Sequence, residues 1–541
     1  MPDASGGNIE SLVLSVAGVS STNELSSQYS VRGGNYDENS VYVNDIEVYR
    51  PLLVRAGQQE GLSFINPDMV EEVSFSAGGF DAQYGDKMSS VLSIQYKKPK
   101  TFEASAGISL LGASAYIGQA SKDKKFTQLH GLRYKTNAYL LGTLEAKGQY
   151  NPSFIDYQTY LTFQFAPKWE ATFLGNFSQN RYNFVPDSLS SSFGTLDNPI
   201  YLNIYYDGQE KDLFRTAFGA GTITYKPNKN LSLGLLLSAF NTNEQETYDI
   251  TGQYWLSSLS PSTSSSDENV IGVGTYHNHA RNKLIATVLN ITHRGEYATE
   301  NNQLKWGIGV QSEFISDKIN EWQLNDSAGY SMPYNDQVVN MYYNLYADTV
   351  ITSYRGTAFI QDTYKWRTSW GLFSFNGGLR ANYWSFNKEF LLSPRLSVSY
   401  LPDWEKDFSF RFATGVYYQS PFYKEMRDTV TDNLGNVKVL LNENIKAQRS
   451  LHFVLGGDYY FKVKNRPFKF TTEIYYKPAD RVIPYSVDNV RIMYTGQNNA
   501  KAYTAGIDLK LFGEFVKGVD SWISLSLMDS KEDIQGDNAG Y

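Results

Sequence analysis

Strict alternation of apolar and polar residues is the feature that most constrains the fold of this 541-residue chain. In the segment 408–419, apolar residues or threonine occupy every second position, and the residues between them are mostly polar or small. The same period recurs in the segments 231–237, 468–477 and 507–511. A period of two places the apolar residues on one face of an extended strand, whereas a helix would need a period of 3.6. The chain is therefore expected to be mainly β.

No stretch of the sequence suits a membrane-spanning helix. Such a helix needs about 18 or more consecutive apolar residues. The longest candidate, Leu231 to Phe240, contains Ser232, Gly234 and Ser238. The mean hydropathy is only -0.40, although the chain has 41 Tyr and 31 Phe. A search for long apolar runs does not detect the strands of a transmembrane barrel, because only every second residue of such a strand faces lipid.

The connections between the expected strands alternate in length. Brief polar joins are predicted at 167–168, 226–230, 365–369, 402–406 and 464–467, and long loops at 181–211, 244–280, 317–353, 421–447 and 480–500. Most loops of compact soluble domains run about four to six residues, so a soluble sandwich gives no reason for this order. An outer-membrane barrel has short periplasmic turns and longer external loops, and about sixteen candidate strands lie between Thr101 and Ser530.

The first hundred residues have a mixed pattern instead. Apolar residues at 9, 12, 13 and 16 predict a short helix between Asn8 and Gly18. The apolar residues around Asn44-Asp45 predict a hairpin with a tight turn. Asn66 followed by Pro67 predicts the start of another short helix, and strands are expected at 73–76 and 91–96. A small α+β module is therefore expected before the β region.

Three blocks of this module resemble the plug domain of TonB-dependent outer-membrane receptors. They are VRGG at 31–34, YVND at 42–45 and SAGGFDAQYGDKMSSVLSI at 76–94, and the segment from Gln448 resembles the late barrel strands of the same family. The resemblance implies an antiparallel barrel of about 22 strands with the plug inside it. It divides the chain into a plug domain, 1–98, and a C-terminally incomplete barrel, 101–541. With about six strands expected after Tyr541 and no signal or TonB box before Met1, we expect a chain truncated at both ends.

The resemblance also implies a function in the bacterial outer membrane. Receptors of this family import a scarce ligand, such as an iron chelate, cobalamin, an oligosaccharide or a peptide. The inner-membrane TonB complex rearranges the plug, here through a missing N-terminal segment, and a surface lipoprotein lid is a further possible partner. The plug residues expected to take part in gating are Arg32, Gly33, Gly34, Asn44, Asp45, Gly78, Gly79, Tyr84 and Gly85.

Charged residues of the module are expected to contact the inside of the barrel. These charges are Arg32, Asp37, Glu38, Asp45, Arg50 and Arg55. Polar residues of the barrel interior, such as Glu473 and Lys510, are possible partners, through contacts that water can replace when the plug moves. Each charge taken alone is better explained as part of a solvated polar surface. Taken together, they predict a polar contact between plug and barrel.

Aromatic residues in the expected external loops are candidates for ligand contact. They are Tyr205, Tyr206, Trp322, Tyr330, Tyr334, Tyr342 and Tyr343. Aromatic faces beside polar side chains suit a sugar or a metal chelate. Packing between loops uses the same residue types, so no single one of them is assigned as a contact.

Enzymatic activity is not expected. The sequence has no GxxxxGK[ST], GxSxG, HExxH or GxGxxG motif, and no cysteine for a thiolate metal site. His277 and His279 share a strand face, but two imidazoles without a third fixed ligand are a weak indication of a metal. A net charge of -8 argues against nucleic-acid binding. No cofactor is expected.

Three functions agree with these patterns. The first is an energised importer, and the second is a passive porin-like channel of about sixteen strands, which would not need the N-terminal module. The third is a soluble all-β adhesion or glycan-binding protein. The alternating connection lengths and the outward apolar faces argue against the third.

Overall fold

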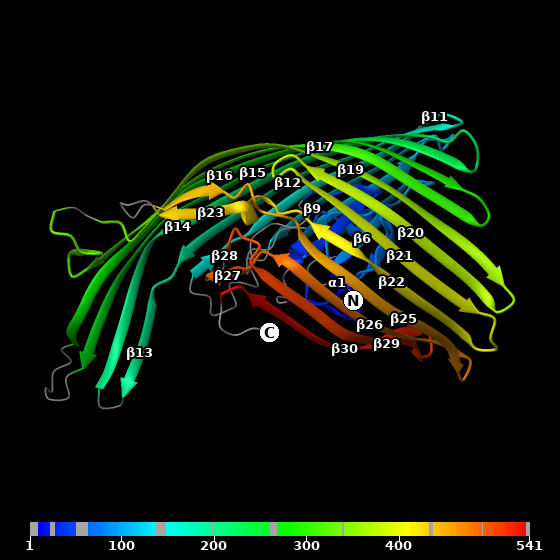
Figure 1. The fold of residues 1–541 in the computed structure, drawn as a ribbon. Helices are drawn as coiled ribbons and strands as arrows, with labels where there is room; N and C mark the ends of the chain where they lie inside the picture. Colours follow the sequence, from blue (N-terminus) through cyan, green and yellow to red (C-terminus); the bar gives the residue numbers. More distant parts are fainter. Residues whose placement is uncertain are drawn as a thin grey trace.

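The computed structural model describes residues 9–21, 28–49, 63–136, 148–195, 198–259, 268–337, 340–431, 437–488 and 491–536. A large, mainly antiparallel sheet curves around a small N-terminal module, as Figure 1 shows. No helix within the described ranges combines the length and the apolar character needed to cross a membrane.

The N-terminal module, residues 9–96, contains short elements around a four-stranded sheet of order β4-β3-β6-β5. Its elements are α1 (Ile9–Val13), β1 (Val19–Ser20), β2 (Ser30–Val31), η1 (Tyr36–Glu38), β3 (Asn39–Val43), β4 (Ile46–Glu47), η2 (Pro67–Met69), β5 (Val70–Ser76) and β6 (Ser90–Tyr96). The predicted hairpin is confirmed, and both turn residues have positive φ, 51° at Asn44 and 62° at Asp45. The Asn66 side chain accepts a hydrogen bond from the Asp68 amide, as expected for a helix cap. The first helix is shorter than predicted, and Leu12 is 55% exposed.

The main sheet begins directly after the module. Its strands are β7 (Glu103–Ser109), β8 (Gly112–Ala120), β9 (Phe126–Thr136), β10 (Gly148–Tyr150), β11 (Ser153–Ala166), β12 (Trp169–Pro186), β13 (Leu189–Thr195), β14 (Asn198–Tyr225), β15 (Leu231–Leu259), β16 (Glu268–Ala298), β17 (Asn302–Ser327), β18 (Tyr330–Met332), β19 (Tyr343–Thr368), β20 (Gly371–Trp384), β21 (Glu389–Pro402), β22 (Asp407–Gln419), β23 (Arg427–Thr431), β24 (Val437–Leu441), β25 (Gln448–Val463), β26 (Arg466–Val482), β29 (Ala500–Val516) and β30 (Val519–Ile534). Outside it lie η3 (Tyr423–Met426) and the hairpin of β27 (Tyr485–Asp488) and β28 (Arg491–Tyr494).

Strands that follow one another along the chain are mostly neighbours in this sheet. Of its 22 described strands, β10, β13, β18, β23 and β24 are short and pair with part of a longer strand or with each other. The other 17 form the main ladder, which is close to the predicted number. Among the described residues, no residue of β30 is paired with a residue of β7, and both strands are exposed along most of their length. Each of them therefore has one hydrogen-bonded neighbour, and the sheet is not closed.

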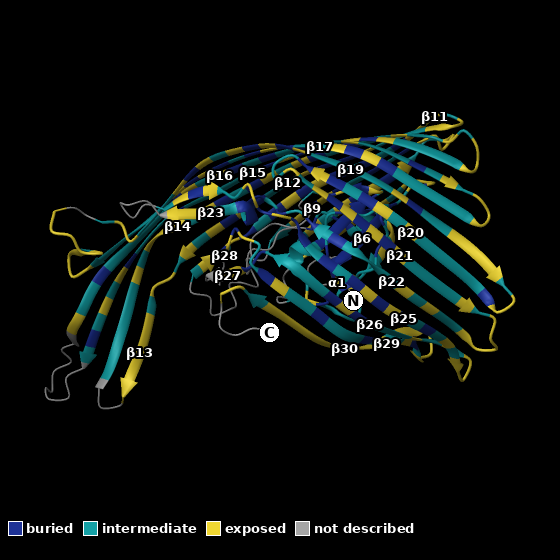
Figure 2. Cartoon of the chain, in the orientation of Figure 1, coloured by how far each residue is buried: buried dark blue, intermediate teal, exposed yellow. Residues whose placement is uncertain are grey.

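Inward and outward side chains alternate along the strands, as the banded colouring of Figure 2 shows. In β15, for example, Leu236 and Phe240 are buried against the N-terminal module, whereas Leu235 and Leu237 are exposed on the outer face. The largest apolar cluster joins the module to the inner face of β8, β9, β11, β12 and β14 to β16. The predicted period is thus confirmed, with one face toward the module and one toward the surroundings.

The long connections, in contrast, are not loops. Most of the segments 181–211, 244–280 and 317–353 is strand, and β14, β15 and β16 reach 28, 29 and 31 residues. In Figure 1, these strands continue as a ribbon beyond the body of the sheet. There polar residues lie on both faces, among apolar ones such as Tyr248, Ile250 and Tyr254, and the backbone pairing persists. The segment 421–447 folds into η3, β23 and β24, and the segment 480–500 includes β27 and β28.

The short joins agree better with prediction. The chain turns at 167–168, 226–230 and 403–406, and at Lys464 and Asn465, which both have positive φ. The join predicted at 365–369 is shifted, since β19 continues to Thr368 and the turn is at 369–370.

Candidate functional site

The candidate site is the polar contact between the N-terminal module and the inner face of β20 to β30. Its centre is Arg32, which is 2% exposed and follows β2 with a φ of 47°. The Arg32 guanidinium donates to Asp508 Oδ2 at 2.9 Å and to the Ala77 carbonyl at 2.6 Å, and it forms an ion pair with Glu473. It also lies over the ring of Tyr475, 4.3 Å from the centroid. One module residue is thus bound to two strands of the sheet, β26 and β29.

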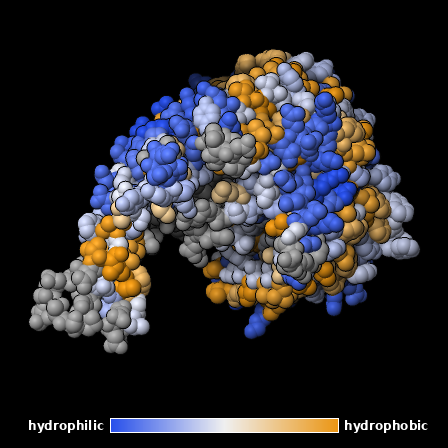
Figure 3. Space-filling model, turned by 60° about the vertical axis from the view of Figure 1, so that its left-hand side comes forward, coloured by the Kyte–Doolittle hydropathy of each residue, from blue (hydrophilic) through white to orange (hydrophobic). Residues whose placement is uncertain are grey.

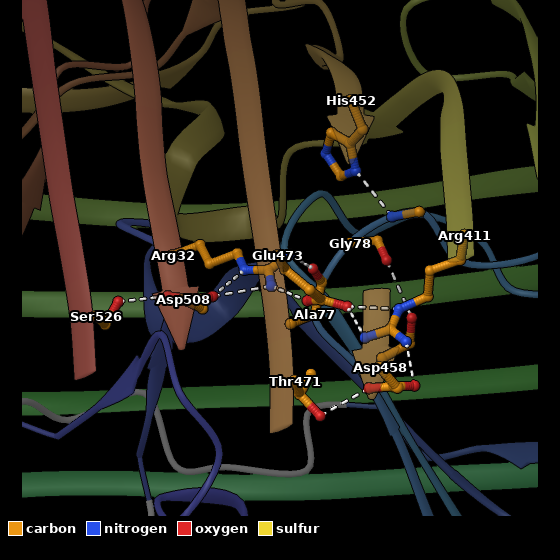
Figure 4. Close-up of polar contacts among 12 residues, drawn as sticks. Arg32, Ala77, Gly78, Arg411, His452, Asp458, Thr471, Glu473, Asp508 and Ser526 are labelled. Atoms are coloured by element: carbon orange, nitrogen blue, oxygen red, sulfur yellow. Dashed lines mark hydrogen bonds and ion pairs between the residues drawn. The ribbon is translucent and has the colours of Figure 1, made fainter. Parts of the chain in front are cut away.

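The two acidic partners of Arg32 belong to a longer polar chain, drawn in Figure 4. Glu473 also receives a hydrogen bond from Arg411, whose other guanidinium nitrogen lies 2.7 Å from Asp458. Asp508 receives a hydrogen bond from Ser526, which lies on β30. Because each carboxylate keeps a second donor, the charges of the site are paired on both sides of Arg32.

The glycine after Arg32 is required by both conformation and space. Gly33 has a φ of 73°, which residues with a Cβ rarely adopt. A Cβ there would lie 2.8 Å from Ser530 Oγ and 2.9 Å from Thr504 Oγ1. The VRGG block therefore brings the module backbone against β29 and β30. Gly34, the next residue, instead packs within the module against Ser89 and Glu38.

A second group of contacts holds the loop 78–86, which contains four of the predicted gating residues. The Gly79 amide donates to Nδ1 of the buried His452 at 3.3 Å, and Gly78 lies beside the same ring. Arg395 donates to the carbonyls of Asp81 and Tyr84, each at 2.7 Å. The sheet thus recognises the backbone of this loop more than its side chains.

Side chains of the sheet also hold the two acidic residues of this loop. Asn376 donates to Asp81 at 2.6 Å and Asn382 donates to Asp86 at 2.7 Å. At Gly85, a Cβ would lie 2.2 Å from Nε of Arg380, so a larger residue there would require this guanidinium to move.

A third group lies on the opposite side of the module. Arg133 of β9 donates to the carbonyls of Ser63 and Ile65, each at 2.7 Å, and is held by Asp156 of β11. Around it, the contact is mainly apolar, and Phe64 packs edge-on against Phe218 with ring centroids 5.6 Å apart. The contact is therefore mainly apolar on the side of β9 to β16 and mainly polar on the side of β20 to β30, where Phe80 also packs against Tyr417.

The module charges that were predicted to contact the sheet have different partners. Asp37 accepts a hydrogen bond from Gln419 at 2.9 Å, and Glu38 accepts one from Ser89 within the module. The Asp45 carbonyl accepts one from Arg294, while the Asn44 side chain accepts one from the Tyr96 amide. Lys510, a predicted sheet partner, donates to the Ser15 carbonyl at 3.3 Å. Arg32 contacts Glu473, one of the residues named as a possible partner of the module charges, and Arg50 and Arg55 lie outside the described residues.

The Asp37 carboxyl lies close to a segment that sequence reasoning did not place here. Burial raises the pKa of Asp37 to about 6. Burial, with the nearby Asp37 carboxyl, also raises the pKa of Glu425, a buried residue of η3. Glu425 accepts a hydrogen bond from Gln448 at 3.0 Å, and the neighbouring Tyr423 donates to Asp317 at 2.7 Å. The segment predicted as an external loop at 421–447 thus folds inward above the module.

The predicted ligand-contact residues are dispersed. Tyr205 and Tyr206 lie in β14, Trp322 in β17, Tyr330 in β18 and Tyr343 in β19, whereas Tyr334 and Tyr342 lie between β18 and β19. Five of the seven are therefore in strands, not loops. Trp322 stacks on His279 at 4.7 Å, and Tyr330 packs edge-on against Tyr334 at 5.6 Å.

Sequence reasoning missed the basic residues on the inner face of the sheet, above all Arg133 and Arg395. A signal was present, because each occupies a polar position in an alternating strand, beside an outward leucine at 132 or 396. His277 and His279 share one face and both lie near Asp249. Within the described part of the chain, no group of three or more His, Cys, Asp or Glu side chains is arranged to hold a metal ion.

Comparison with known proteins agrees with this architecture. A family model described as "TonB dependent receptor-like, beta-barrel" matches residues 168–541, and one described as "TonB-dependent Receptor Plug Domain" matches residues 1–91. No curated protein sequence matches the chain.

Several solved structures share the fold at low sequence identity. The siderophore receptor PirA from Pseudomonas aeruginosa has a TM-score of 0.59 at 13% identity, over 98% of this chain and 83% of that one. The outer membrane transporter YddB from Escherichia coli has a TM-score of 0.61 at 12% identity, over 97% and 75%. The RagAB peptide transporter has a TM-score of 0.59 at 11% identity, over 100% and 74%. The two family matches together span the plug and most of the sheet, and the chain belongs to the TonB-dependent receptors of the bacterial outer membrane.

Proposed function

We propose that this receptor imports a scarce ligand through the outer membrane, with the N-terminal module acting as a plug that is moved by the inner-membrane TonB complex. The observation that carries this proposal is the set of ion pairs that Arg32 makes with Glu473 and Asp508. Water can take the place of the partners of an ion pair or a hydrogen bond when the plug moves, whereas it cannot replace apolar burial. A plug held in this way can leave its position and return to it.

The two sides of the plug differ in the kind of contact, and this difference suggests a path. The contact with β9 to β16 buries apolar side chains such as Leu129, Phe218 and Phe240. On the side of β20 to β30, the plug is held by Arg32 and by the donors Asn376 and Arg395. Water can replace donors and acceptors on the second side but not the burial on the first. The passage is therefore proposed to open on the polar side.

An engineered disulfide tests whether this side must open. The chain has no cysteine, so a pair at Ala82 and Gly378 would be the only one. A Cβ at Gly378 would lie 2.6 Å from the Ala82 Cβ, and a small shift brings the pair into the usual range of about 3.5 to 4.5 Å. We expect Ala82→Cys with Gly378→Cys to block uptake when oxidised and to restore it on reduction. The single variant Ala82→Cys is the control and should be insensitive to oxidation.

The ligand class is to be found by uptake of defined probes into cells that express the receptor. The probes are a ferric chelate, cobalamin, a maltooligosaccharide and a pentapeptide. Uptake of the active probe should stop when a protonophore collapses the inner-membrane proton gradient. Uptake that continues would favour a passive channel and overturn the proposed energisation. A lipoprotein lid would be detected as a stoichiometric partner in the purified receptor.

A further inference from the structure

Four basic side chains lie together on the outer face of the sheet. They are Arg181 of β12, Lys211 and Arg215 of β14, and Lys283 of β16, here called the basic patch. All four are exposed, whereas Tyr182, Asp212 and Leu284, which follow Arg181, Lys211 and Lys283, are buried on the inner face. The alternation of the strands therefore directs the basic patch away from the plug.

The pairing of the strands brings these four positions close together. Arg181 pairs with Leu213, Leu213 pairs with Gln245, and Gln245 pairs with Lys283, so that these residues form one row across four strands. Neighbouring strands are about 4.8 Å apart, which places the Cα atoms of Arg181 and Lys283 about 14 Å apart. Lys211 and Arg215 flank Leu213 along β14, about 13 Å from each other at about 3.3 Å per residue. Four long cationic side chains can thus reach one headgroup-sized area.

The charges of the basic patch are not neutralised by the protein. Among the described residues, no carboxylate forms an ion pair with any of the four, and Arg215 donates only to Gln179, at 3.1 Å. The nearest acid in sequence, Asp212, is 3% exposed on the inner face. The adjacent cations Arg281 and Lys318 are paired with Asp249 and Asp348, and so they are not counted in the patch.

The basic patch lies at the border of the apolar outer surface. On the side of the short turns, the outer face carries Phe177, Leu237, Leu289 and Phe314, with exposures of 51%, 54%, 52% and 43%. On the other side, the strands continue into the polar ribbon. Figure 3 shows separate hydrophobic and hydrophilic areas over the body, with hydrophilic residues where the projecting ribbon leaves the body and hydrophobic residues again farther along the ribbon. Since long external segments mark the outer side of such proteins, the patch is at the level of the outer-leaflet headgroups.

We propose that the basic patch binds the phosphate groups of an anionic lipid in the outer leaflet. Guanidinium and ammonium groups form charge-assisted hydrogen bonds with phosphate oxygens. The adjoining apolar face accommodates the acyl chains of the same molecule, which a free phosphate ion does not possess. The patch therefore fits a lipid bearing two phosphates near the membrane surface, and the site is separate from the import path.

The test uses the full chain in phosphatidylcholine nanodiscs that contain a minor fraction of diphosphorylated lipid A. Lipid retained after detergent extraction and purification is counted by native mass spectrometry. The variant is the triple substitution Arg181→Gln, Arg215→Gln and Lys283→Gln. The matched control removes three exposed lysines of the short turns, Lys168→Gln, Lys229→Gln and Lys406→Gln.

We expect the triple variant to retain at least about tenfold less lipid A than the wild type, since each basic residue adds measurably to binding of an anionic surface. The control should retain as much as the wild type. A version in which lysine replaces Arg181 and Arg215 should keep most of the binding, because the charge is preserved. Equal retention by the triple variant, or equal retention of dephosphorylated lipid, would overturn the proposal. Complete displacement by inorganic phosphate would assign the patch to the free ion and overturn the lipid assignment.

Discussion

Replacing Arg32 with methionine is expected to loosen the plug selectively on its polar side. The variant removes the ion pair with Glu473 and the hydrogen bonds to Asp508 and to the Ala77 carbonyl. Removing one partner of a buried ion pair costs about 3 to 5 kcal/mol. Both acids keep another donor, Arg411 for Glu473 and Ser526 for Asp508, so the low end of about 3 kcal/mol applies. That free energy raises the population of the undocked state about 100-fold, at about 1.4 kcal/mol per factor of ten.

Amide hydrogen exchange in the purified receptor measures this effect locally. The Arg32 amide, which donates to the Gly18 carbonyl at 2.8 Å, and the amides of β1 and β2 should lose about two orders of magnitude of protection. The amides of β5 and β6 should keep their protection, because the remaining contacts still hold them. The variant Arg215→Met, which removes an exposed outward arginine, serves as the control and should leave the plug unchanged.

A double-mutant cycle distinguishes the ion pair from general damage to the fold. Arg32→Met combined with Asp508→Asn should cost clearly less than the sum of the two single changes, because the residues are in direct contact. Additive costs, or equal protection in the wild type and in Arg32→Met, would refute the reasoning that this contact latches the plug.

Three further perturbations test other parts of the structure. Arg395→Met leaves the carbonyls of Asp81 and Tyr84 without their donor, at a cost of about 2 to 4 kcal/mol, and limited proteolysis should cut the loop 78–86 faster. Because the pKa of Asp37 is raised from 3.8 to about 6, its stabilising contribution is complete below about pH 3.8 and is lost as the pH rises through about 6. Exchange in η1, corrected for the intrinsic rate, should quicken over this range in the wild type and not in Asp37→Asn. Leu237→Arg places a charge on the outer apolar face and should destabilise the sheet by about 2 to 4 kcal/mol, measured by urea unfolding in phosphatidylcholine vesicles.

Much of the fold was predictable because its signals are local. The alternation around Phe408 and Leu235 specified strands with one apolar face, and the turn residues Asn44 and Asp45 specified the hairpin. The prediction of long loops was wrong where the strands leave the apolar surroundings, as in β15 beyond Asn241. There polar residues such as Glu244 and Asp249 occur on both faces of the strand, which weakens the apolar period on which a prediction of strands depends.

The polar character of the candidate site was predictable from the sequence, but most of its specific contacts were not. The polar character of the plug surface was evident from its charges, and Arg32 and Glu473 were both among the named residues. The inward folding of η3 and the roles of Arg133, Arg395 and His452 were not foreseen. Each of these depends on which strand faces which part of the plug.

The sequence by itself determined the strands, the plug module and the two faces of the sheet, because spacing along the chain decides where successive side chains point. Only the tertiary structure decided that Arg32 meets Asp508, 476 residues away, and that the basic patch assembles from three strands. Contacts of this kind depend on the register and curvature of the whole sheet, which sum over many strand pairs and leave no local pattern. The sheet, described from β7 to β30, is open between these two strands, and this too is a property of the assembled structure.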